Sequence, residues 1–398
     1  MKITQCTAKE ILDSRGVPTL EVGMMSDNVS VCASVPSGKS TGSNEALEKR
    51  DADGRGVSGA IASVNETIAK EIVGRDMKQS DIDRLLLELD GTDNKSNLGA
   101  NAMLGVSIAA TKLAAAVEDI PVWKFIADKN SANPKLPKLF MNIINGGAHS
   151  DFRLPFQEYM IVPEDGLVSV SYKKAQRIIE TLGSVLQKRF GEIPMGDEGG
   201  YSPILSTIEE PFELLSEIIA DENIFLAIDA AATEFYKDGE YQLLGKSYSR
   251  KELTQIYKNL INNFNLKSIE DPFEEFALED FVQLTKEIGD SVLIVGDDLT
   301  VTNPSLIMEM VDKKAINSVI IKPNQIGTLS EVYEAVTIAH GAGWKTIASH
   351  RSGDTMDSFI ADLAVGIGAY GIKAGSPSQK ERKVKYDRLL EIEKEMNK

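Results

Sequence analysis

"SVIIKPNQIGTLSEVYEAVTIAHGAGWKTIASH", residues 318–350, contains a complete strand–helix–strand pattern. Its first apolar run ends at Lys322, and its last apolar run ends at His350. Between the two runs, apolar residues recur at i, i+3, i+4 and i+7, which indicates a helix with one buried face: Val332, Ala335, Val336 and Ala339. Two buried strands joined by a helix are typical of a parallel β/α unit.

The same pattern repeats through the second half of the chain, where short apolar runs each end in a charged or polar residue. These terminal residues are Asp229, Glu270, Asp297, Lys322, His350 and Lys373. Their spacing is about what a strand, a helix and two loops occupy, so we predict an α/β fold. A TIM-type β/α barrel fits best, and a doubly wound open sheet is the alternative.

In a barrel the carboxyl ends of the parallel strands meet on one face, so the six terminal residues should converge there. Any one of them is compatible with a structural role, because charged residues commonly follow buried strands. Together, Asp229, Glu270 and Asp297 offer the oxygen ligands that a hard cation such as Mg²⁺ prefers. We therefore predict a magnesium site at this face.

The first part of the chain has a different pattern, which predicts an α+β domain over residues 1–128. "TLEVGM" and "VCASV" are strand-like, whereas the sequence from "ALEKR" (46–50) onward, "SDIDRLLLELDG" and "NAMLGVSIAATKLAAAV" are helix-like. "DKNSANPKLPKL", residues 128–139, holds two prolines among polar residues and predicts a boundary. The barrel domain is then expected over residues 135–398.

Composition narrows the class of partner and the compartment. The 398 residues carry a net charge of −17, which disfavours nucleic acid and anionic membranes as partners. Cys6 and Cys32 have no metal-ligand spacing, so a reducing, cytoplasmic compartment is expected. The amino-terminal residues lack the apolar region of a secretion signal, and Lys112 interrupts the most apolar later stretch. No membrane span is predicted.

"PSGKSTG", residues 36–42, ends like a phosphate-binding P-loop but lacks two of its requirements. Ala33 stands where the P-loop needs its first glycine, and Pro36 removes one backbone N–H that could bind phosphate. We therefore favour a mobile surface turn over a nucleotide-binding loop.

Nine stretches, in order along nearly the whole chain, together resemble the enolase family. They are "EILDSRGVPTLEV", "PSGKSTG", "LDGTDNKSNLGANAMLGVS", "NGGAHSDFRLPFQEYMIVP", "GDEGGYSP", "SIEDPF", "GDDLTVTNP", "IKPNQIGTLSE" and "SHRSGDT". The resemblance implies an α+β capping domain followed by a catalytic barrel whose second strand is antiparallel. That strand would begin at Gln157 and Glu158, on the catalytic face.

The resemblance also implies the activity: reversible dehydration of 2-phosphoglycerate to phosphoenolpyruvate, a step of glycolysis and gluconeogenesis, with two Mg²⁺ ions per active site. By position, Asp229, Glu270 and Asp297 match the ligands of the first Mg²⁺, and Ser40 matches a ligand of the second. Enolases are generally dimers or octamers, so a homodimer or homo-octamer is expected.

Catalytic roles carry over from the resemblance in the same way. Lys322 matches the base that removes the proton at C2, and positive charge from Mg²⁺ and Lys373 should depress its pKa. Glu198 matches the acid that protonates the departing hydroxyl, assisted by Glu158. A Lys or His base that acts with Mg²⁺ on an ene-diolate is general to the enolase superfamily, so this part of the assignment comes from the resemblance.

Substrate contacts complete the implied site. Arg351 and Ser352 match a phosphate clamp, and Lys373 matches the partner of the substrate carboxylate. Three further residues match groups near the substrate: Gln157, His149 and His350.

Two departures from the family pattern affect the loops around this site. Lys39 replaces a residue that is usually small in the family, and we expect it to point to solvent, with a contact to phosphate left open. Residues 149–156 differ from the family's commoner polar stretch, so we expect the departure to affect the kinetics of this loop and not the catalytic groups.

Three rival functions remain open at this point. A superfamily relative that acts on a sugar acid or lactone would keep the three carboxylates but would lack the phosphate groups Ser40, Arg351 and Ser352. A non-catalytic surface-binding role is disfavoured because every catalytic position is filled. A P-loop NTPase would depend on residues 36–42 alone.

Overall fold

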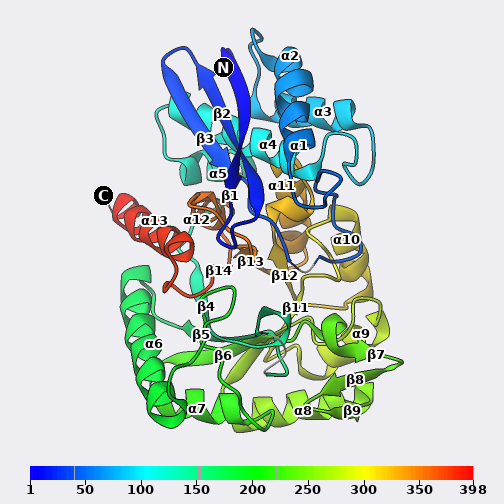
Figure 1. Ribbon diagram of the computed structural model, residues 1–398, viewed down its shortest axis with the longest axis vertical. Coiled ribbons are helices and arrows are strands. Elements are labelled where there is room, and N and C mark those ends of the chain that lie inside the picture. Colours follow the sequence, from blue (N-terminus) through cyan, green and yellow to red (C-terminus); the bar gives the residue numbers. More distant parts are fainter. Residues whose placement is uncertain (40, 151–153, 221, 398) are drawn as a thin grey trace.

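The computed structural model describes residues 1–39, 41–150, 154–220 and 222–397. An amino-terminal α+β unit, drawn in blue and cyan, stacks on a larger β/α unit drawn in green to red (Figure 1). The chain enters the larger unit between helix α5, which ends at Asn130, and strand β4, which begins at Lys138.

The amino-terminal unit is a three-stranded antiparallel sheet covered by helices. Its strands are β1 (Gln5–Leu12), β2 (Pro18–Ser26) and β3 (Val29–Ser34). Its helices are α1 (Ser58–Ala62), the π-helical turn η1 (Ser63–Ile68), α2 (Ala69–Ile72), α3 (Gln79–Asp90), α4 (Ala100–Val117) and α5 (Val122–Asn130). Leu20, Val22 and Met24 alternate along β2 and are fully buried, as expected for a sheet with one covered face.

The helix predicted from Ala46 onward is wrong, because residues 46–50 form no helix and the first helix begins at Ser58. The backbone N–H of Ala46 donates to the carbonyl of Gln325, and that of Leu47 donates to the carbonyl of Asn94. A helix that started at Ala46 would pair the N–H of Asp51 with the carbonyl of Leu47, but that carbonyl accepts from Ala100 and the Asp51 N–H donates to Gly56. The segment instead crosses from the α+β unit to the barrel.

The larger unit is a closed barrel of eight strands, which confirms the TIM-type prediction and makes the open-sheet alternative wrong. The strands are β4 (Lys138–Asn145), β5 (Glu158–Pro163), β6 (Ile224–Asp229), β10 (Leu266–Glu270), β11 (Leu293–Gly296), β12 (Ser318–Ile321), β13 (Lys345–Ser349) and β14 (Gly371–Lys373). Strand β5 is antiparallel to both neighbours, and the remaining pairs are parallel. The implied antiparallel second strand is thus confirmed.

Helices follow the strands and cover the outside of the barrel. They are α6 (Val168–Phe190), α7 (Glu210–Ile219), α8 (Arg250–Asn263), α9 (Leu278–Ile288), α10 (Pro304–Lys313), α11 (Leu329–Gly341), α12 (Phe359–Gly366) and α13 (Lys380–Met396). Helix α11 buries the predicted face, including Val332 and Ala339. Short elements fill the loops: η2 (Gly147–Ser150), η3 (Ala232–Phe235), β7 (Tyr236–Lys237), β8 (Glu240–Leu243), β9 (Lys246–Tyr248) and η4 (Pro323–Gln325).

The barrel interior is filled by a compact apolar cluster that separates the polar groups at its two ends. Its buried members are Phe140, Met160, Val162, Phe225, Ala227, Val295, Ile320 and Ile347. Side chains alternate between the two faces of a strand, so the residue two positions further on shares the interior face. Two positions after Ala227, Val295 and Ile320 come Asp229, Asp297 and Lys322. The alternation of the strands therefore aims these three side chains into the barrel end.

Helix α4 is long and apolar enough to cross a membrane, with a mean hydropathy of 1.4 over 18 residues. However, 83% of this window is buried inside the protein. Gly105 in this helix approaches Val22 of the sheet closely, as in a packed core helix. Its apolar character is therefore accounted for by packing between the sheet and the barrel.

Candidate active site

The end of the barrel formed by the strand carboxyl termini encloses a polar cavity, and most of the predicted site residues line it. These are Gln157, Glu158, Glu198, Asp229, Asp297, Lys322, His350, Arg351, Ser352 and Lys373. Because β5 runs opposite to the other strands, its first residue, Glu158, pairs in register with Asp229, the last residue of β6. The antiparallel strand thus adds Glu158, and the residue just before the strand, Gln157, to the face where the other strands end.

Lys373 lies at the centre of three buried carboxylates. Its Nζ lies 2.9 Å from Asp229 Oδ2, 2.9 Å from Glu270 Oε2 and 3.2 Å from Glu158 Oε1. Burial acts to lower the pKa of Lys373, but the surrounding carboxylates outweigh it and raise that pKa well above its ordinary value. The lysine therefore joins Glu270 and Asp229, two of the predicted metal ligands, through one ammonium group.

Asp297, the third predicted ligand, contacts Lys322 through Oδ2 and accepts a hydrogen bond of 2.9 Å from Gln325 Nε2 through Oδ1. Burial acts to raise the pKa of Asp297, but the charge of Lys322 outweighs burial and lowers that pKa below its ordinary value. Burial of Lys322 likewise favours a lower pKa, but Asp297 reverses the direction and raises it. The depressed pKa predicted for Lys322 depends on the positive charge of bound Mg²⁺ and stays a prediction. The direct contact with Asp297, which that prediction did not include, opposes the depression.

Two further carboxylates that the sequence reasoning missed lie beside Asp297. Single oxygen atoms of Asp271, Asp297 and Asp298 lie within 4.8 Å of one another. The Asp271 carboxylate accepts hydrogen bonds of 2.9 Å from the backbone N–H groups of Asp297 and Asp298. Burial and the charge of Asp297 raise the pKa of Asp298 to about 8. The sequence could have indicated these two carboxylates, because "IEDPF" and "VGDD" each place two adjacent acidic residues at a strand end.

The residues present fit a hard divalent cation. Carboxylates outnumber cationic side chains around the cavity. Glu158 Oε2 and Gln157 Oε1 are buried oxygen atoms without a hydrogen-bond partner among the described residues. Burial, followed by the charge of Asp229, raises the pKa of Glu270 well above its ordinary value. Crowded, desolvated oxygen donors of this kind are the ligands that Mg²⁺ prefers.

Glu198 and Glu158 form a second group of carboxylates on the cavity wall. Asn142 Nδ2 donates a hydrogen bond of 2.9 Å to Glu198 Oε2. Burial, and then the charge of Glu198, raises the pKa of Glu158 well above its ordinary value. Two buried carboxylates that repel one another in this way favour a state in which one of them holds a proton.

His350 connects this acidic pair to helix α13. Arg382 Nη1 lies 2.5 Å from His350 Nδ1, and because a guanidinium only donates, Nδ1 must accept. The ring proton then lies on Nε2, which is 3.5 Å from Glu198 Oε2. Burial lowers the pKa of His350 to about 4, so the imidazole is neutral near pH 7.

Arg351 lies fully within the cavity wall, where its guanidinium is already oriented by protein groups. Nη1 and Nη2 donate to the two carboxylate oxygens of Glu45, at 2.9 and 3.1 Å, and Nη1 also donates to Asn324 Oδ1 at 3.1 Å. Glu45 immediately precedes the segment wrongly predicted as a helix, residues 46–50. Its contact with Arg351 was missed because no local pattern links the two residues.

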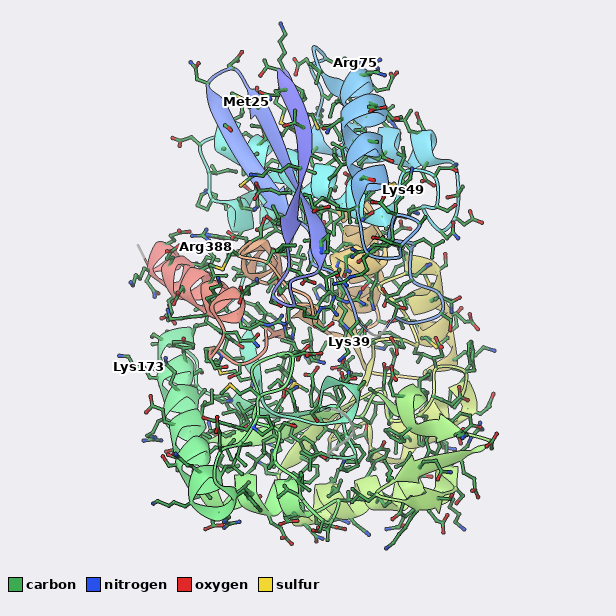
Figure 2. All side chains as sticks on the ribbon, in the orientation of Figure 1. Met25, Lys39, Lys49, Arg75, Lys173 and Arg388 are labelled. Carbon is green, nitrogen blue, oxygen red and sulfur yellow. The ribbon has the colours of Figure 1, made fainter. Side chains whose placement is uncertain are left out.

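Ser352 links the cavity to the segment that begins at Pro36. The Ser352 hydroxyl accepts hydrogen bonds from the backbone N–H of Lys39, at 2.8 Å, and from Arg15 Nη1, at 3.4 Å. Lys39 does not simply point to solvent as predicted: its Nζ donates to Asp197 Oδ2 at 2.9 Å. In Figure 2, Lys39 is labelled where the amino-terminal unit meets the barrel.

Three predicted residues are not among the described residues that line the cavity, and one of them, Glu270, lies behind the lining and contacts it through Lys373. Ser40, the predicted ligand of a second Mg²⁺, lies outside the described residues. The backbone of His149 belongs to the short turn η2, next to the strand that carries Asn145. The predicted divergent segment 149–156 includes residues 151–153, which also lie outside the described residues.

Comparison with known proteins agrees with this architecture. The family model "Enolase, N-terminal domain" matches residues 3–126, and "Enolase, C-terminal TIM barrel domain" matches residues 133–398. The chain is 46% identical to the enolase of Methanopyrus kandleri, over 99% of this chain and 96% of that protein. It is 44% identical to the enolase of Thermococcus gammatolerans and 45% identical to that of Bdellovibrio bacteriovorus, each over 99% of this chain and 95% and 96% of the relative.

Proposed function

This chain belongs to the enolase family, and we propose from that premise that its barrel cavity catalyses the reversible dehydration of 2-phosphoglycerate to phosphoenolpyruvate. The activity is that of phosphopyruvate hydratase, a hydro-lyase of glycolysis. The observation that carries the assignment to this cavity is the convergence of Lys322, Glu198 and Arg351 on one barrel end, beside crowded carboxylates. These groups are a base, an acid and an anion binder.

Mg²⁺ would be held by Asp229, Glu270 and Asp297, and a second ion by Ser40. When bound, Mg²⁺ supplies positive charge that stabilises the negative charge developing on the substrate when C2 loses its proton. Asp271 supports this arrangement by holding the backbone N–H groups of residues 297 and 298. Asp298, which lies with Asp271 and Asp297 in the compact acidic group, is an alternative ligand.

Lys322 is the proposed base that takes the proton from C2. Its position at the end of β12 is fixed by the alternation of the strand, and its ammonium contacts Asp297. The ammonium must lose a proton before it can accept one. The Asp297 contact opposes that loss, so the acid–base role requires this ion pair to weaken in the working enzyme.

Glu198 is the proposed acid that protonates the departing hydroxyl, with Glu158 and His350 beside it. Asn142 orients the Glu198 carboxylate, and repulsion between Glu198 and Glu158 favours retention of a proton on the pair. A proton shared by two carboxylates is available to a leaving group. His350 directs its Nε2 toward the same carboxylate.

The remaining residues would hold the two charged ends of the substrate. Arg351 and Ser352 would bind the phosphate, for which a planar guanidinium offers two parallel donors. Lys373 would bind the substrate carboxylate, with Gln157 adjacent. His149 would lie near the substrate on the turn between β4 and β5.

The domain bounds, the compartment and the assembly are also proposed from family membership. We propose an amino-terminal capping domain over residues 1–128 and a catalytic barrel over residues 135–398, in a cytoplasmic homodimer or homo-octamer. Light scattering at micromolar concentration tests the assembly, and a monomer mass would contradict it. A charge of −17 per chain opposes assembly at low salt, so the mass should be measured at physiological salt.

The activity is tested by following phosphoenolpyruvate formation from 2-phosphoglycerate with and without Mg²⁺. We expect turnover only with the metal, and much slower turnover of a non-phosphorylated sugar acid. Faster turnover of the sugar acid would favour the rival superfamily reaction. Full turnover in excess chelator would remove the magnesium assignment.

A further inference from the structure

Lys39 connects segments that lie next to two residues of the cavity lining, Ser352 and Glu198. Its side chain is 45% exposed, and its ammonium donates to Asp197 Oδ2 at 2.9 Å and to the carbonyl oxygen of Ala148 at 3.1 Å. These acceptors belong to two different loops, one before β5 and one that carries Glu198. One lysine therefore touches both loops on the acid side of the cavity.

The backbone of Lys39 is attached to the opposite wall. Its N–H donates to the Ser352 hydroxyl at 2.8 Å. Two residues earlier, Ser37 exchanges two backbone hydrogen bonds with Gly353, at 2.8 and 2.9 Å. The backbone at residues 37 and 39 is therefore hydrogen-bonded to the segment that carries the proposed phosphate clamp, and the side chain of Lys39 reaches across to Asp197.

The loop that carries Glu198 does not need Lys39 for its own shape. The backbone N–H of Gly200 donates to Asn145 Oδ1 at 2.9 Å, and the N–H of Ser376 donates to the Glu198 carbonyl at 2.9 Å. Asn142 holds the Glu198 side chain. What Lys39 adds is a connection between this loop and the clamp.

We propose that Lys39 is a positioning residue that couples the phosphate clamp to the Glu198 loop through its ion pair with Asp197. The proposal rests on the function assigned above, because it concerns how the two walls hold 2-phosphoglycerate. By setting the separation of the walls before the substrate arrives, the ion pair reduces the ordering cost of binding.

The size of the effect follows from the exposure of the pair. A solvent-exposed ion pair changes an equilibrium by about two- to fivefold. The ion pair is equally available to bound substrate and transition state, so it should alter KM and leave kcat nearly unchanged. We expect Lys39→Met to raise KM for 2-phosphoglycerate by about two- to fivefold, with kcat within about twofold.

The rival explanation is that Lys39 binds the substrate phosphate directly, and Asp197→Asn separates the two. If Lys39 is a phosphate ligand, removing the Asp197 charge frees a cation for a polyanionic substrate, and KM should fall. If Lys39 couples the walls, the same change breaks the ion pair, and KM should rise about as much as in Lys39→Met. The two ideas therefore predict opposite signs.

The experiment measures KM and kcat for wild type, Lys39→Met, Asp197→Asn and the double variant, with Mg²⁺ at saturation. We expect both single variants to raise KM and the double variant to raise it no further. Lys39→Arg should stay within about twofold of wild type, because arginine can still pair with the carboxylate. The rise in KM should shrink at high salt, where exposed charges are screened.

Lys383→Met is the matched control, because Lys383 also pairs with an aspartate, Asp387, at 2.7 Å and with similar exposure, but on the outer surface of α13. It should leave KM unchanged. A lower KM in Asp197→Asn, or an unchanged KM in Lys39→Met, would overturn the proposal. Absence of 2-phosphoglycerate dehydration in the wild type would instead remove the proposed function.

Discussion

At the scale of single residues, the cavity separates the proposed base from the proposed acid. Lys322 extends from the end of β12 and is tied to Asp297, whereas Glu198 lies in a loop and is tied to Asn142. Replacing Lys322 removes the contact with Asp297 and leaves the hydrogen bond from Asn142 to Glu198 in place, and replacing Glu198 leaves the contact between Lys322 and Asp297 in place.

This separation predicts different failures for the two variants. Lys322→Ala should neither dehydrate 2-phosphoglycerate nor exchange its C2 hydrogen with D₂O, because no other base replaces the amine. Glu198→Gln should lose about 10²- to 10⁴-fold in dehydration, as expected for a lost general acid, but should keep C2 exchange. Proton NMR in D₂O measures the exchange, and an assay for phosphoenolpyruvate measures the dehydration.

Exchange that survives in Lys322→Ala would show that another group is the base. Exchange that vanishes in Glu198→Gln, with metal binding intact, would show that Glu198 takes part in removing the C2 proton. Lys322→Ala removes the cationic partner of the buried Asp297 and should lower the unfolding temperature, so thermal unfolding of each variant is measured and the assays are run well below it, which separates loss of structure from loss of chemistry.

At the scale of elements, helix α13 holds the loop that carries the clamp. Arg382, at the start of this helix, is fully buried. Its guanidinium donates to the carbonyl oxygens of Arg351, at 2.6 Å, and Ser352, at 2.8 Å, and to Asp354 Oδ2 at 3.2 Å. The clamp residues therefore depend on a side chain that does not face the cavity.

We predict that Arg382→Met destabilises the protein by about 3–5 kcal/mol, because it leaves two buried carbonyl groups without this donor and removes one of the two cations paired with Asp354, the other being Lys385 at 3.0 Å. Urea unfolding measures the change. Arg382→Lys should recover only part of the loss, since an ammonium cannot reproduce the planar fork of donors. Lys380→Met, an exposed change in the same helix, should stay within about 0.5 kcal/mol of wild type.

A second inter-element contact joins the α+β unit to the barrel. Lys112 of α4 donates to both carboxylate oxygens of Asp357, at 2.7 Å each, and the backbone N–H of Ser34 donates to Asp357 Oδ2 at 2.9 Å. Burial favours a raised pKa for Asp357, but Lys112 and the backbone donors lower it overall. This carboxylate is therefore more acidic in the folded protein than in the unfolded chain.

We predict that Lys112→Met lowers the free energy of unfolding by about 2–3 kcal/mol near pH 7. This value is at the low end for a buried ion pair because the ammonium is partly exposed. A lowered folded pKa gives stability that is present above the unfolded value near 3.8 and is lost as pH falls below it. The difference between variant and wild type should therefore shrink below about pH 4. Urea unfolding across pH checks this, with the exposed Lys124→Met as control, and a constant difference would contradict it.

At the scale of the whole molecule, the excess of buried carboxylates predicts that Mg²⁺ stabilises the fold. At a hundredfold excess over Kd, a ligand that binds only the folded state adds about 2.7 kcal/mol. The unfolding temperature should therefore rise when Mg²⁺ is added and fall reversibly with chelator. Calorimetry measures both, and it does not depend on activity.

Asp229→Asn should lose most of this thermal shift, whereas Asp387→Asn on the outer surface of α13 should keep it. An equal shift in both variants would place the ion elsewhere on this acidic protein. If Asp229→Asn keeps the full thermal shift but loses activity, Asp229 acts in catalysis and does not bind the metal.

The sequence by itself determined the alternation of strands and helices in the barrel and the residues at which the strands end. Both follow from local periodicity, because a buried strand and an amphipathic helix leave their patterns within a few residues. Closure of the barrel then brings Asp229, Asp297 and Lys322 together whatever the details of the loops.

Only the tertiary structure decided how these residues are paired. It placed Lys373 among Asp229, Glu270 and Glu158, and it turned residues 46–50 from an expected helix into a crossing segment that follows Glu45, the partner of Arg351. It also directed Lys39 to Asp197. The physical reason is that ion pairs and backbone contacts between distant segments depend on which loops meet in space, and no local sequence pattern records that meeting.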